Sequence, residues 1–387
     1  MSTIKVNNIE STAGGGVAAK LSSVNGGTIG TKNLVINGDF RISQRHGTAG
    51  TASDGGFPVD RFVLSHNDTN ESPRGEQSTV AAGTDPYSKG FRNSLLITNG
   101  NQTSGAGAGD VVVFYTRLEA GDIATSGWNY TDSNSFITLS FWVKSSVAQE
   151  FRGRVVTNDG TAQNYVISYT LSANTWTKVT KQIPGNSNLQ FDNNNGNGLA
   201  IEWTIFRGTN MTASGTSLNT WNTNASSNSA GTDMTSTWYT TNDATFEVTG
   251  VQLEVGNVAT DFEHRSFGQE MLLCQRYFQR YTHATYRGVA FSGRKSGSGT
   301  VIGCVQGMPS MRAAATSGVS NVAGFRLYRF LDGTTATPTA VSVSHEGSAE
   351  PYNVLRYILS TTSFSTGNLI GLYATNTAGS LSLDAEL

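Results

Sequence analysis

The sequence is poor in cysteine, in charge and in long apolar runs, and each shortage excludes a class of protein. Only two of its 387 residues are cysteine, Cys274 and Cys304, so we expect free thiols, made in the reducing host cytoplasm, and no disulfide framework. No run of about eighteen apolar residues occurs, so we expect no membrane insertion. Charged residues make up 14% of the chain and the formal net charge is −2. The chain therefore lacks the excess of positive charge that binds nucleic acid.

Catalytic and metal-binding patterns are also scarce. The five histidines show no metal-ligand spacing, and no G-x-S-x-G motif occurs. The stretch 288–296 nearly matches a phosphate-binding loop, but Arg294 separates its glycine from its lysine. The stretch also lies among predicted strands and not before a helix. Asp192 and Glu202 could serve as the carboxylate pair of a glycosidase, but the sequence gives no distance between them. We therefore expect no enzyme, no catalytic residue and no cofactor.

Abundant glycine, hydroxyl and amide residues favour β-strands joined by polar turns. The chain has 44 glycines and 10% aromatics, and its length predicts two or more domains. Short strands separated by turn signals are typical of a sandwich or jelly roll. We predict strands at 33–40, 61–65, 94–98, 111–118, 136–143, 152–157, 165–171, 176–182, 199–206 and 245–255. The strand at 136–143 is among the most apolar, so we assign its Trp142 to the core.

The pattern changes along the chain predict four parts. Residues 1–30 hold one short apolar piece (Ile4, Val6 and Ile9) followed by glycine breaks, which indicates either a virion-docking arm or a frayed terminus. Residues 31–262 form a jelly-roll-like β domain, 263–281 a linking amphipathic helix, and 282–387 a smaller C-terminal β-sandwich. In that last part we predict strands at 325–330, 354–359, 369–374 and 381–387. The fold class is therefore all-β with one short linking α-helix.

The linking helix carries the clearest local signal. Ser266 precedes Gln269 by three residues, which is the spacing of a capping box. An apolar seam follows, at Phe267, Met271, Cys274, Phe278 and Tyr281. A heptad seam requires a partner surface, so the helix lies either at an oligomer interface or against its own domain.

Several aromatic residues lie in polar sequence, which is unusual for core residues. They are Trp128, Tyr130, Trp221, Trp238 and Tyr239, the last three in a long loop region at 207–243. Flat rings stack on sugar C–H faces, while nearby amides bond hydroxyl groups, so these residues are candidate glycan contacts. Packing in the core and covering of a subunit interface are the alternatives.

Motifs along most of the chain resemble those of bacteriophage tail fibres. They are Asn33-Leu-Val-Ile-Asn-Gly-Asp-Phe40 with Arg41-Ile-Ser-Gln-Arg45, Asp60-Arg-Phe62, Phe141-Trp-Val-Lys-Ser-Ser146, Cys274-Gln-Arg-Tyr-Phe-Gln-Arg280, Met308-Pro-Ser-Met-Arg-Ala313 and Ser382-Leu-Asp-Ala-Glu-Leu387. The opening Met1-Ser-Thr-Ile-Lys-Val-Asn-Asn-Ile9 is similar to fibres of phages that infect marine bacteria. The resemblance implies a homotrimeric virion protein that docks on the tail or another virion protein through its N-terminus and meets a host glycan or outer-membrane receptor.

Residues 33–262 also resemble jelly-roll carbohydrate-binding modules, which often hold structural calcium where the first and last strands meet. Arg41 stands where an acid is common, and the stretch 246–250 replaces a pair of aspartates, so calcium is doubtful here. The function implied by both resemblances is multivalent, non-covalent attachment of a virion to host surface glycan. A purely structural fibre or connector, and a fibre that depolymerises polysaccharide, are the alternatives.

Overall fold

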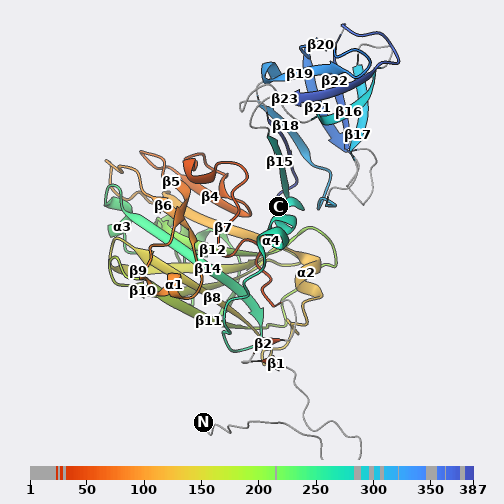
Figure 1. Ribbon diagram of the computed structural model, residues 1–387. Helices are drawn as coiled ribbons and strands as arrows, with labels where there is room; N and C mark the ends of the chain where they lie inside the picture. Colours follow the sequence, from red (N-terminus) through yellow and green to blue (C-terminus); the bar gives the residue numbers. More distant parts are fainter. Residues whose placement is uncertain are drawn as a thin grey trace, which may run out of the picture.

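The protein is built from two β-rich units joined by a short helix. The computed structural model describes residues 32–213, 216–282, 289–295, 300–305, 309–320, 322–345, 355–361, 363–374 and 380–387, together with the paired strands β1 (Ser23–Val24) and β2 (Gly27–Thr28). Figure 1 shows helix α4 between the units, with the C-terminus beside it. The predicted docking residues Ile4, Val6 and Ile9 lie outside the described residues. No helix in the described ranges has the length and apolarity to cross a bilayer.

The first unit is a sandwich of two antiparallel sheets. Its seven-stranded sheet has the order β13-β10-β9-β12-β7-β4-β3, and its five-stranded sheet has the order β11-β8-β14-β6-β5. The strands are β3 (Gly56–Val59), β4 (Phe62–Asn67), β5 (Arg74–Thr79), β6 (Asn93–Thr98), β7 (Val111–Glu119), β8 (Phe136–Ser145), β9 (Gln149–Thr157), β10 (Gln163–Leu171), β11 (Thr177–Pro184), β12 (Asn197–Arg207), β13 (Trp221–Thr223) and β14 (Thr245–Val255). Helical turns are α1 (Asp85–Ser88), α2 (Ala120–Ala124), α3 (Thr237–Thr240), η1 (Gly47–Ala49), η2 (Thr209–Met211) and η3 (Ser226–Asn228). The all-β, jelly-roll-like prediction is confirmed.

Alternation along the strands builds the core between the sheets. In β8, Ile137, Leu139 and Phe141 point inward and are buried. Trp203 of β12 meets them there, with its ring 5.5 Å from that of Phe141. Trp142 has the opposite parity and lies half-buried on the outer face, so its assignment to the core was wrong.

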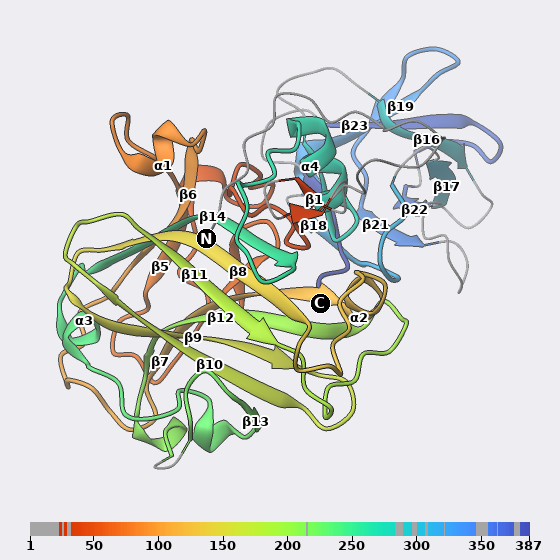
Figure 2. The same cartoon turned by 90° about the horizontal axis from the view of Figure 1, so that it is seen from below.

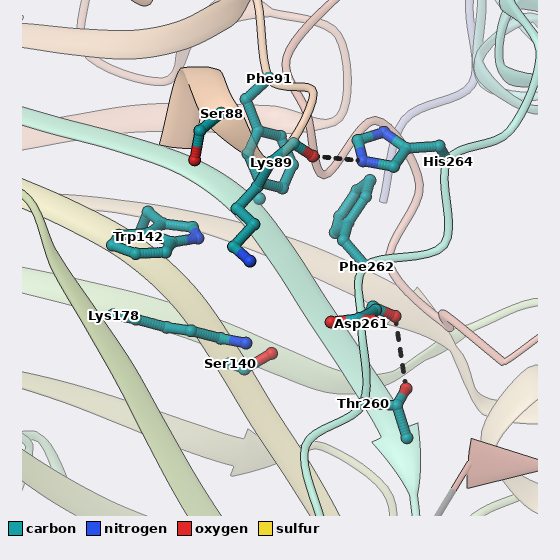
Figure 3. A pocket seen from close by; sticks show the side chains of 11 residues that line it. Ser88, Lys89, Phe91, Ser140, Trp142, Lys178, Thr260, Asp261, Phe262 and His264 are labelled. Carbon is teal, nitrogen blue, oxygen red and sulfur yellow. Dashed lines mark hydrogen bonds between the residues drawn. The ribbon is translucent and has the colours of Figure 1, made fainter. Parts of the chain in front are cut away.

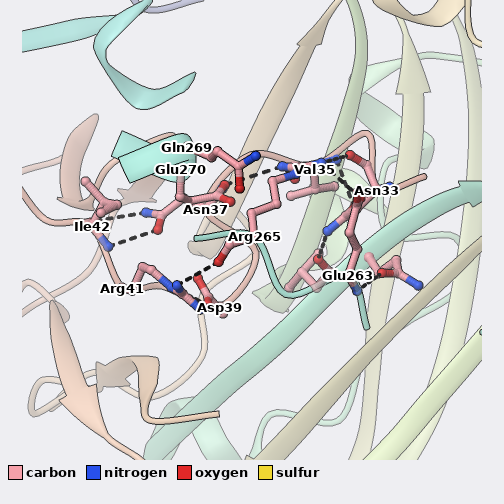
Figure 4. Close-up of polar contacts among 12 residues, drawn as sticks. Asn33, Val35, Asn37, Asp39, Arg41, Ile42, Glu263, Arg265, Gln269 and Glu270 are labelled. Atoms are coloured by element: carbon pink, nitrogen blue, oxygen red, sulfur yellow. Dashed lines mark hydrogen bonds and ion pairs between the residues drawn. The ribbon is translucent and has the colours of Figure 1, made fainter. Parts of the chain in front are cut away.

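The first described segment is not the strand predicted at 33–40. It is an extended stretch and turn held by asparagine side chains (Figure 4). The Asn33 amide donates to the Val251 carbonyl of β14 and accepts from the Leu253 amide. Asn37, in the left-handed region at φ 61°, donates from its side-chain amide to the carbonyls of Ile42 and of Asp60, which lies in the turn between β3 and β4. These side-chain bonds replace the strand pairing that an alternating pattern predicts.

A lysine lies where the similar jelly-roll modules often hold calcium. Where the first segment meets β14, the Lys32 ammonium donates to the Thr260 hydroxyl at 2.7 Å and to the Asp261 carbonyl at 2.6 Å. Arg265 lies in the same junction and pairs with Glu263 at 3.3 Å. Across the described ranges, no three His, Cys, Asp or Glu side chains gather in a way that could hold a metal ion.

The second unit also packs two sheets on one core. A three-stranded sheet has the order β15-β24-β18, and a seven-stranded sheet has the order β20-β19-β23-β16-β17-β22-β21. Its strands are β15 (Phe278–Thr282), β16 (Val289–Lys295), β17 (Thr300–Val305), β18 (Thr316–Ser320), β19 (Phe325–Arg329), β20 (Thr335–Ala336), β21 (Ala340–His345), β22 (Leu355–Ser360), β23 (Leu369–Ala374) and β24 (Ser380–Asp384), with the turn η4 (Val322–Gly324). Leu383 of β24 and Leu372 of β23 share this core. The C-terminal segment is therefore part of a sheet.

Helix α4 (Phe267–Gln275) begins as the sequence predicts but ends earlier. The Ser266 hydroxyl accepts from the Gln269 amide at 3.3 Å, and the Gln269 side chain accepts from the Ser266 amide at 3.0 Å, which forms the capping box. The helix stops because the chain then pairs with β24 as strand β15. The seam is thus not one helical face, since Phe278 and Tyr281 lie in that strand.

Two seam residues face their own chain. Cys274 is a fully buried free thiol, and Phe278 is 5% exposed beneath the Arg45 guanidinium, 3.5 Å from its ring centroid. These two residues therefore cannot contact another subunit as predicted. The side chain of Cys304 lies outside the described residues. Met271 and Tyr281 are half-buried, and Phe267 is 58% exposed.

Charged and polar bonds fix the helix and second unit to the first. Arg276 donates to both oxygens of Glu119, each at 2.7 Å, and the Tyr277 hydroxyl donates to the same carboxylate at 2.6 Å. From the other side, Arg45 pairs with Asp384 of β24 at 2.9 Å. Because these contacts are partly buried and charge-assisted, they hold the two units in one arrangement.

Candidate functional site

Three of the five predicted sugar-contact residues are core residues. Trp238 and Tyr239, in α3, are 0% and 1% exposed, and Trp128 is 3% exposed. The Tyr239 ring stacks 4.4 Å from that of Phe206, and the Trp238 indole donates to the Thr245 carbonyl at 3.0 Å. Their ring faces are covered by protein, so they cannot stack on a sugar. Polar neighbours in sequence misled the prediction, because helix α3 of the predicted loop region packs against the sandwich.

The other two predicted aromatics are half-buried at one turn. The Trp221 indole donates to the Pro184 carbonyl at 2.7 Å, and the Asn186 amide donates to the Tyr130 carbonyl at 2.8 Å. Tyr130 also packs edge-on against Phe191, with ring centroids 4.9 Å apart. The five residues therefore do not form one platform.

A hollow on the outer face of the seven-stranded sheet is the site that the sequence did not reveal. It crosses β4, β7, β12 and β9, encloses about 410 Å³, and is called the sheet groove here. Figure 2 shows β12, β9 and β10 side by side in this sheet. Strand register places Tyr115, Glu202 and Arg154 in one row across the sheet. Outward-pointing residues of three strands thus meet at its centre.

The centre of the sheet groove is a buried ion-pair network. The Glu202 carboxylate accepts from Arg154 at 2.7 Å, from Arg207 at 3.0 Å and from the Thr204 hydroxyl at 2.8 Å. Arg154 also reaches the Asn224 side chain at 3.4 Å. Burial alone would raise the pKa of Glu202, but the two guanidinium groups outweigh it and lower that pKa to about 2. The carboxylate therefore stays ionised.

Apolar and aromatic groups complete the lining. Val111, Val113 and Val156 lie beside Ala200, and Tyr115 presents a half-buried ring. Burial raises the pKa of Tyr115, against the nearby Arg117, so the phenol stays protonated and can donate or accept a hydrogen bond. Mixed C–H surface and fixed donors suit an amphipathic ligand with several hydroxyl groups.

Glu202 is placed to hold two arginines rather than to transfer a proton. Glu202 holds two arginines, so it cannot act as the protonated acid that glycoside hydrolysis needs. Asp192, the other acid considered from sequence, does not line the sheet groove. In the sequence, Glu202 is the one acidic residue of β12, and this alone did not indicate a groove.

Comparisons with known proteins give no family for this chain. No protein-family model and no curated protein matches the sequence. Similar solved structures include the enzymatically active domain of bacteriophage CBA120 tailspike protein 4, with 11% identity over 58% of this chain and 21% of that chain and a TM-score of 0.31. The CBM22-1–GH10 modules of Clostridium thermocellum xylanase 10B match with 11% identity over 56% of this chain and 30% of that chain, with a TM-score of 0.27.

A third similar structure is a single binding module. The CBM22-1 xylan-binding domain of Paenibacillus barcinonensis Xyn10C matches with 11% identity over 59% of this chain and all of that chain, with a TM-score of 0.28. This chain spans 21% of the length of the tailspike domain and 30% of that of the xylanase modules. Similarity at this level does not identify a ligand or a partner.

Proposed function

We propose that this protein is a fibre subunit of a bacteriophage particle that attaches the virion to host surface glycan through the sheet groove. The observation that carries glycan binding is the fixed Arg154–Glu202–Arg207 network beside the Tyr115 ring, all on rigid strands. Strand-borne groups lose little freedom on binding, so weak hydroxyl contacts remain productive. The fibre motifs in the sequence support the virion role. Binding proceeds without cleavage in this proposal.

A glycan array of bacterial surface polysaccharides tests this function. The intact protein should bind at least one polysaccharide, and Tyr115→Ala should reduce that binding by roughly tenfold, since stacking and a hydrogen bond are lost together. Tyr328→Ala, in β19 of the second unit, is the matched control and should bind normally. A folded protein that binds nothing, or a Tyr115→Ala variant with full affinity, would contradict the groove assignment. Released reducing ends would contradict binding without cleavage.

We further propose that α4 contributes to a homotrimer. Phe267 and Leu272 are 58% and 56% exposed, and a hollow of about 550 Å³ is lined by Leu272, Leu273, Arg276 and Pro309. Exposed apolar residues around a hollow are typical of an association surface. Three linked grooves would raise the avidity of weak glycan contacts. A monomer in ultracentrifugation at micromolar concentration would contradict this arrangement.

The N-terminal residues are proposed as the virion-docking part. Residues 1–30 carry Ile4, Val6 and Ile9, which match the fibre-like opening of the sequence. Deleting residues 1–30 should abolish incorporation into particles while the rest of the chain stays folded and associated. Particles that still incorporate the truncated protein would refute the docking role.

A further inference from the structure

A second pocket lies on the opposite face of the sandwich, on the five-stranded sheet. It has a volume of about 350 Å³, and Trp142 and Ser140 of β8, Lys178 of β11, Lys89, Asp261 and Phe262 line it. We call it the Trp142 pocket. Trp142 is the half-buried outward residue that the sequence had placed in the core. The Trp142 pocket and the sheet groove share no lining residue.

The wall of the Trp142 pocket is a packed aromatic cluster. Phe91 lies edge-on to Phe262 at 4.9 Å, and His264 packs 4.9 Å from Phe262 and 5.2 Å from Phe91. A His264 ring nitrogen lies 2.9 Å from the Lys89 carbonyl, which ties the α1 turn to this wall. At the bulge in β14, Gly250 has φ +65°, and a Cβ there would lie 2.5 Å from the Phe91 ring. The wall is therefore preformed.

Two lysine side chains end in the open part of the pocket. Figure 3 shows the Lys89 and Lys178 ammonium groups lying between Trp142 and Asp261. Lys178 is held opposite Trp142 by the β8–β11 register. Among the ion pairs of the described residues, neither lysine has a partner. Lys144, the next outward residue of β8, differs because it pairs with Glu247.

These groups match one class of ligand. An indole face binds the C–H face of a sugar ring, two ammonium groups bind an anionic substituent, and the Asp261 carboxylate can accept from hydroxyl groups. Two positive charges and one negative charge leave the pocket electropositive. We propose that the Trp142 pocket binds an acidic sugar residue, with its carboxylate on Lys89 and Lys178. This site does not depend on the sheet groove, so each subunit presents a glycan site on each outer face.

Fluorine NMR of the 5-fluorotryptophan protein tests the proposal. The chain has 6 tryptophans, and Trp142→Phe identifies the Trp142 signal by its loss. D-Glucuronate and D-glucose differ only in the carboxylate at C6, so they are a matched pair of probes. Glucuronate should shift the Trp142 signal with a dissociation constant about tenfold or more below that of glucose, because it adds charge-assisted hydrogen bonds. Raising the salt concentration should weaken glucuronate binding only.

Lysine variants test whether the two pocket lysines cause the preference for an acidic sugar. The double variant Lys89→Gln/Lys178→Gln should lose the preference for glucuronate, while Lys144→Gln should keep it, since that lysine is already paired. Equal shifts by glucose and glucuronate, or the absence of any shift, would overturn the proposal. A double variant that keeps the preference for glucuronate would also overturn the proposal. Because Tyr115→Ala alters only the sheet groove, loss of array binding in that variant with an unchanged Trp142 response would show the two sites to be independent.

Discussion

Replacing Glu202 with glutamine tests the physical basis of the sheet groove most directly. The substitution keeps the size of the side chain and one acceptor oxygen, but it removes the charge between Arg154 and Arg207. Both arginine side chains are more than four-fifths buried, at 14% and 12% exposure. Glu202→Gln therefore leaves two guanidinium groups without a counter-charge in a poorly solvated place, which is costly.

The size of the effect follows from the titration of Glu202. Its pKa falls from an ordinary 4.5 to about 2, despite burial, because of the two arginines. By linkage, that difference corresponds to about 3 kcal/mol of folding free energy at neutral pH. Since the folded pKa is the lower one, this stability is present above pH 4.5 and is lost as the pH falls toward 2. We expect Glu202→Gln to lose a similar amount at pH 7.

Urea unfolding followed by tryptophan fluorescence measures this loss. All 6 tryptophans lie between residues 128 and 238, so the signal reports the first unit alone. The midpoint should fall by about 1 M urea or more. Glu150→Gln on β9 is the control, because Glu150 is 43% exposed in its pair with Arg152 and should cost less than about 1 kcal/mol.

Two results would refute the reasoning. The first is a Glu202→Gln protein whose stability at pH 7 equals that of the Glu150→Gln control. The second is a stability gap between wild type and Glu202→Gln that stays constant as the pH is lowered from 4.5 toward 2. Either would mean that the arginines do not stabilise the ionised carboxylate in the folded protein.

Three further outcomes follow from other parts of the chain. Gly38→Ala should lower the urea midpoint, because a Cβ there would lie 2.1 Å from a β14 carbonyl, while Gly268→Ala, with open space around it, should not. Glu119→Gln should loosen the second unit and speed limited proteolysis at the junction. Burial alone would raise the pKa of Glu119, but hydrogen bonds from Arg276 and Tyr277 lower it. Wild-type docking should therefore also weaken as the pH falls below 4.5. Leu272→Glu should reduce self-association in sedimentation, whereas Leu331→Glu, at an 82% exposed site, should not.

The strands and the helix start were predictable because local patterns determine them. Strand β14 has the predicted bounds, and the capping box at Ser266 forms as expected. The end of α4 was not predictable, because strand β15 pairs with a segment of β24 more than a hundred residues away. The prediction of a strand at 33–40 failed for a similar reason, since the Asn33 side chain forms a hydrogen bond with distant β14.

The binding surfaces were much harder to predict. Trp142 shares its face of the strand with Thr138 and Ser140, so alternation places it outside, and its apolar character alone led to the wrong assignment. Tyr115 and Arg154 meet Glu202 only through strand pairing between distant segments. Their sequence neighbours give no sign of this, so the groove appears only once the register is known.

The two outer faces differ in how their charges are compensated, and this difference has a functional consequence. In the sheet groove Arg154 and Arg207 are both paired with Glu202, so that face offers hydrogen-bond donors that are held in place by ion pairs. In the Trp142 pocket Lys89 and Lys178 have no such partner among the described ion pairs, so attraction there depends on ionic strength. A polysaccharide that alternates neutral and acidic residues would engage both faces of neighbouring subunits. Raising the salt concentration should then lower the avidity of this polysaccharide until only the binding at the sheet groove remains.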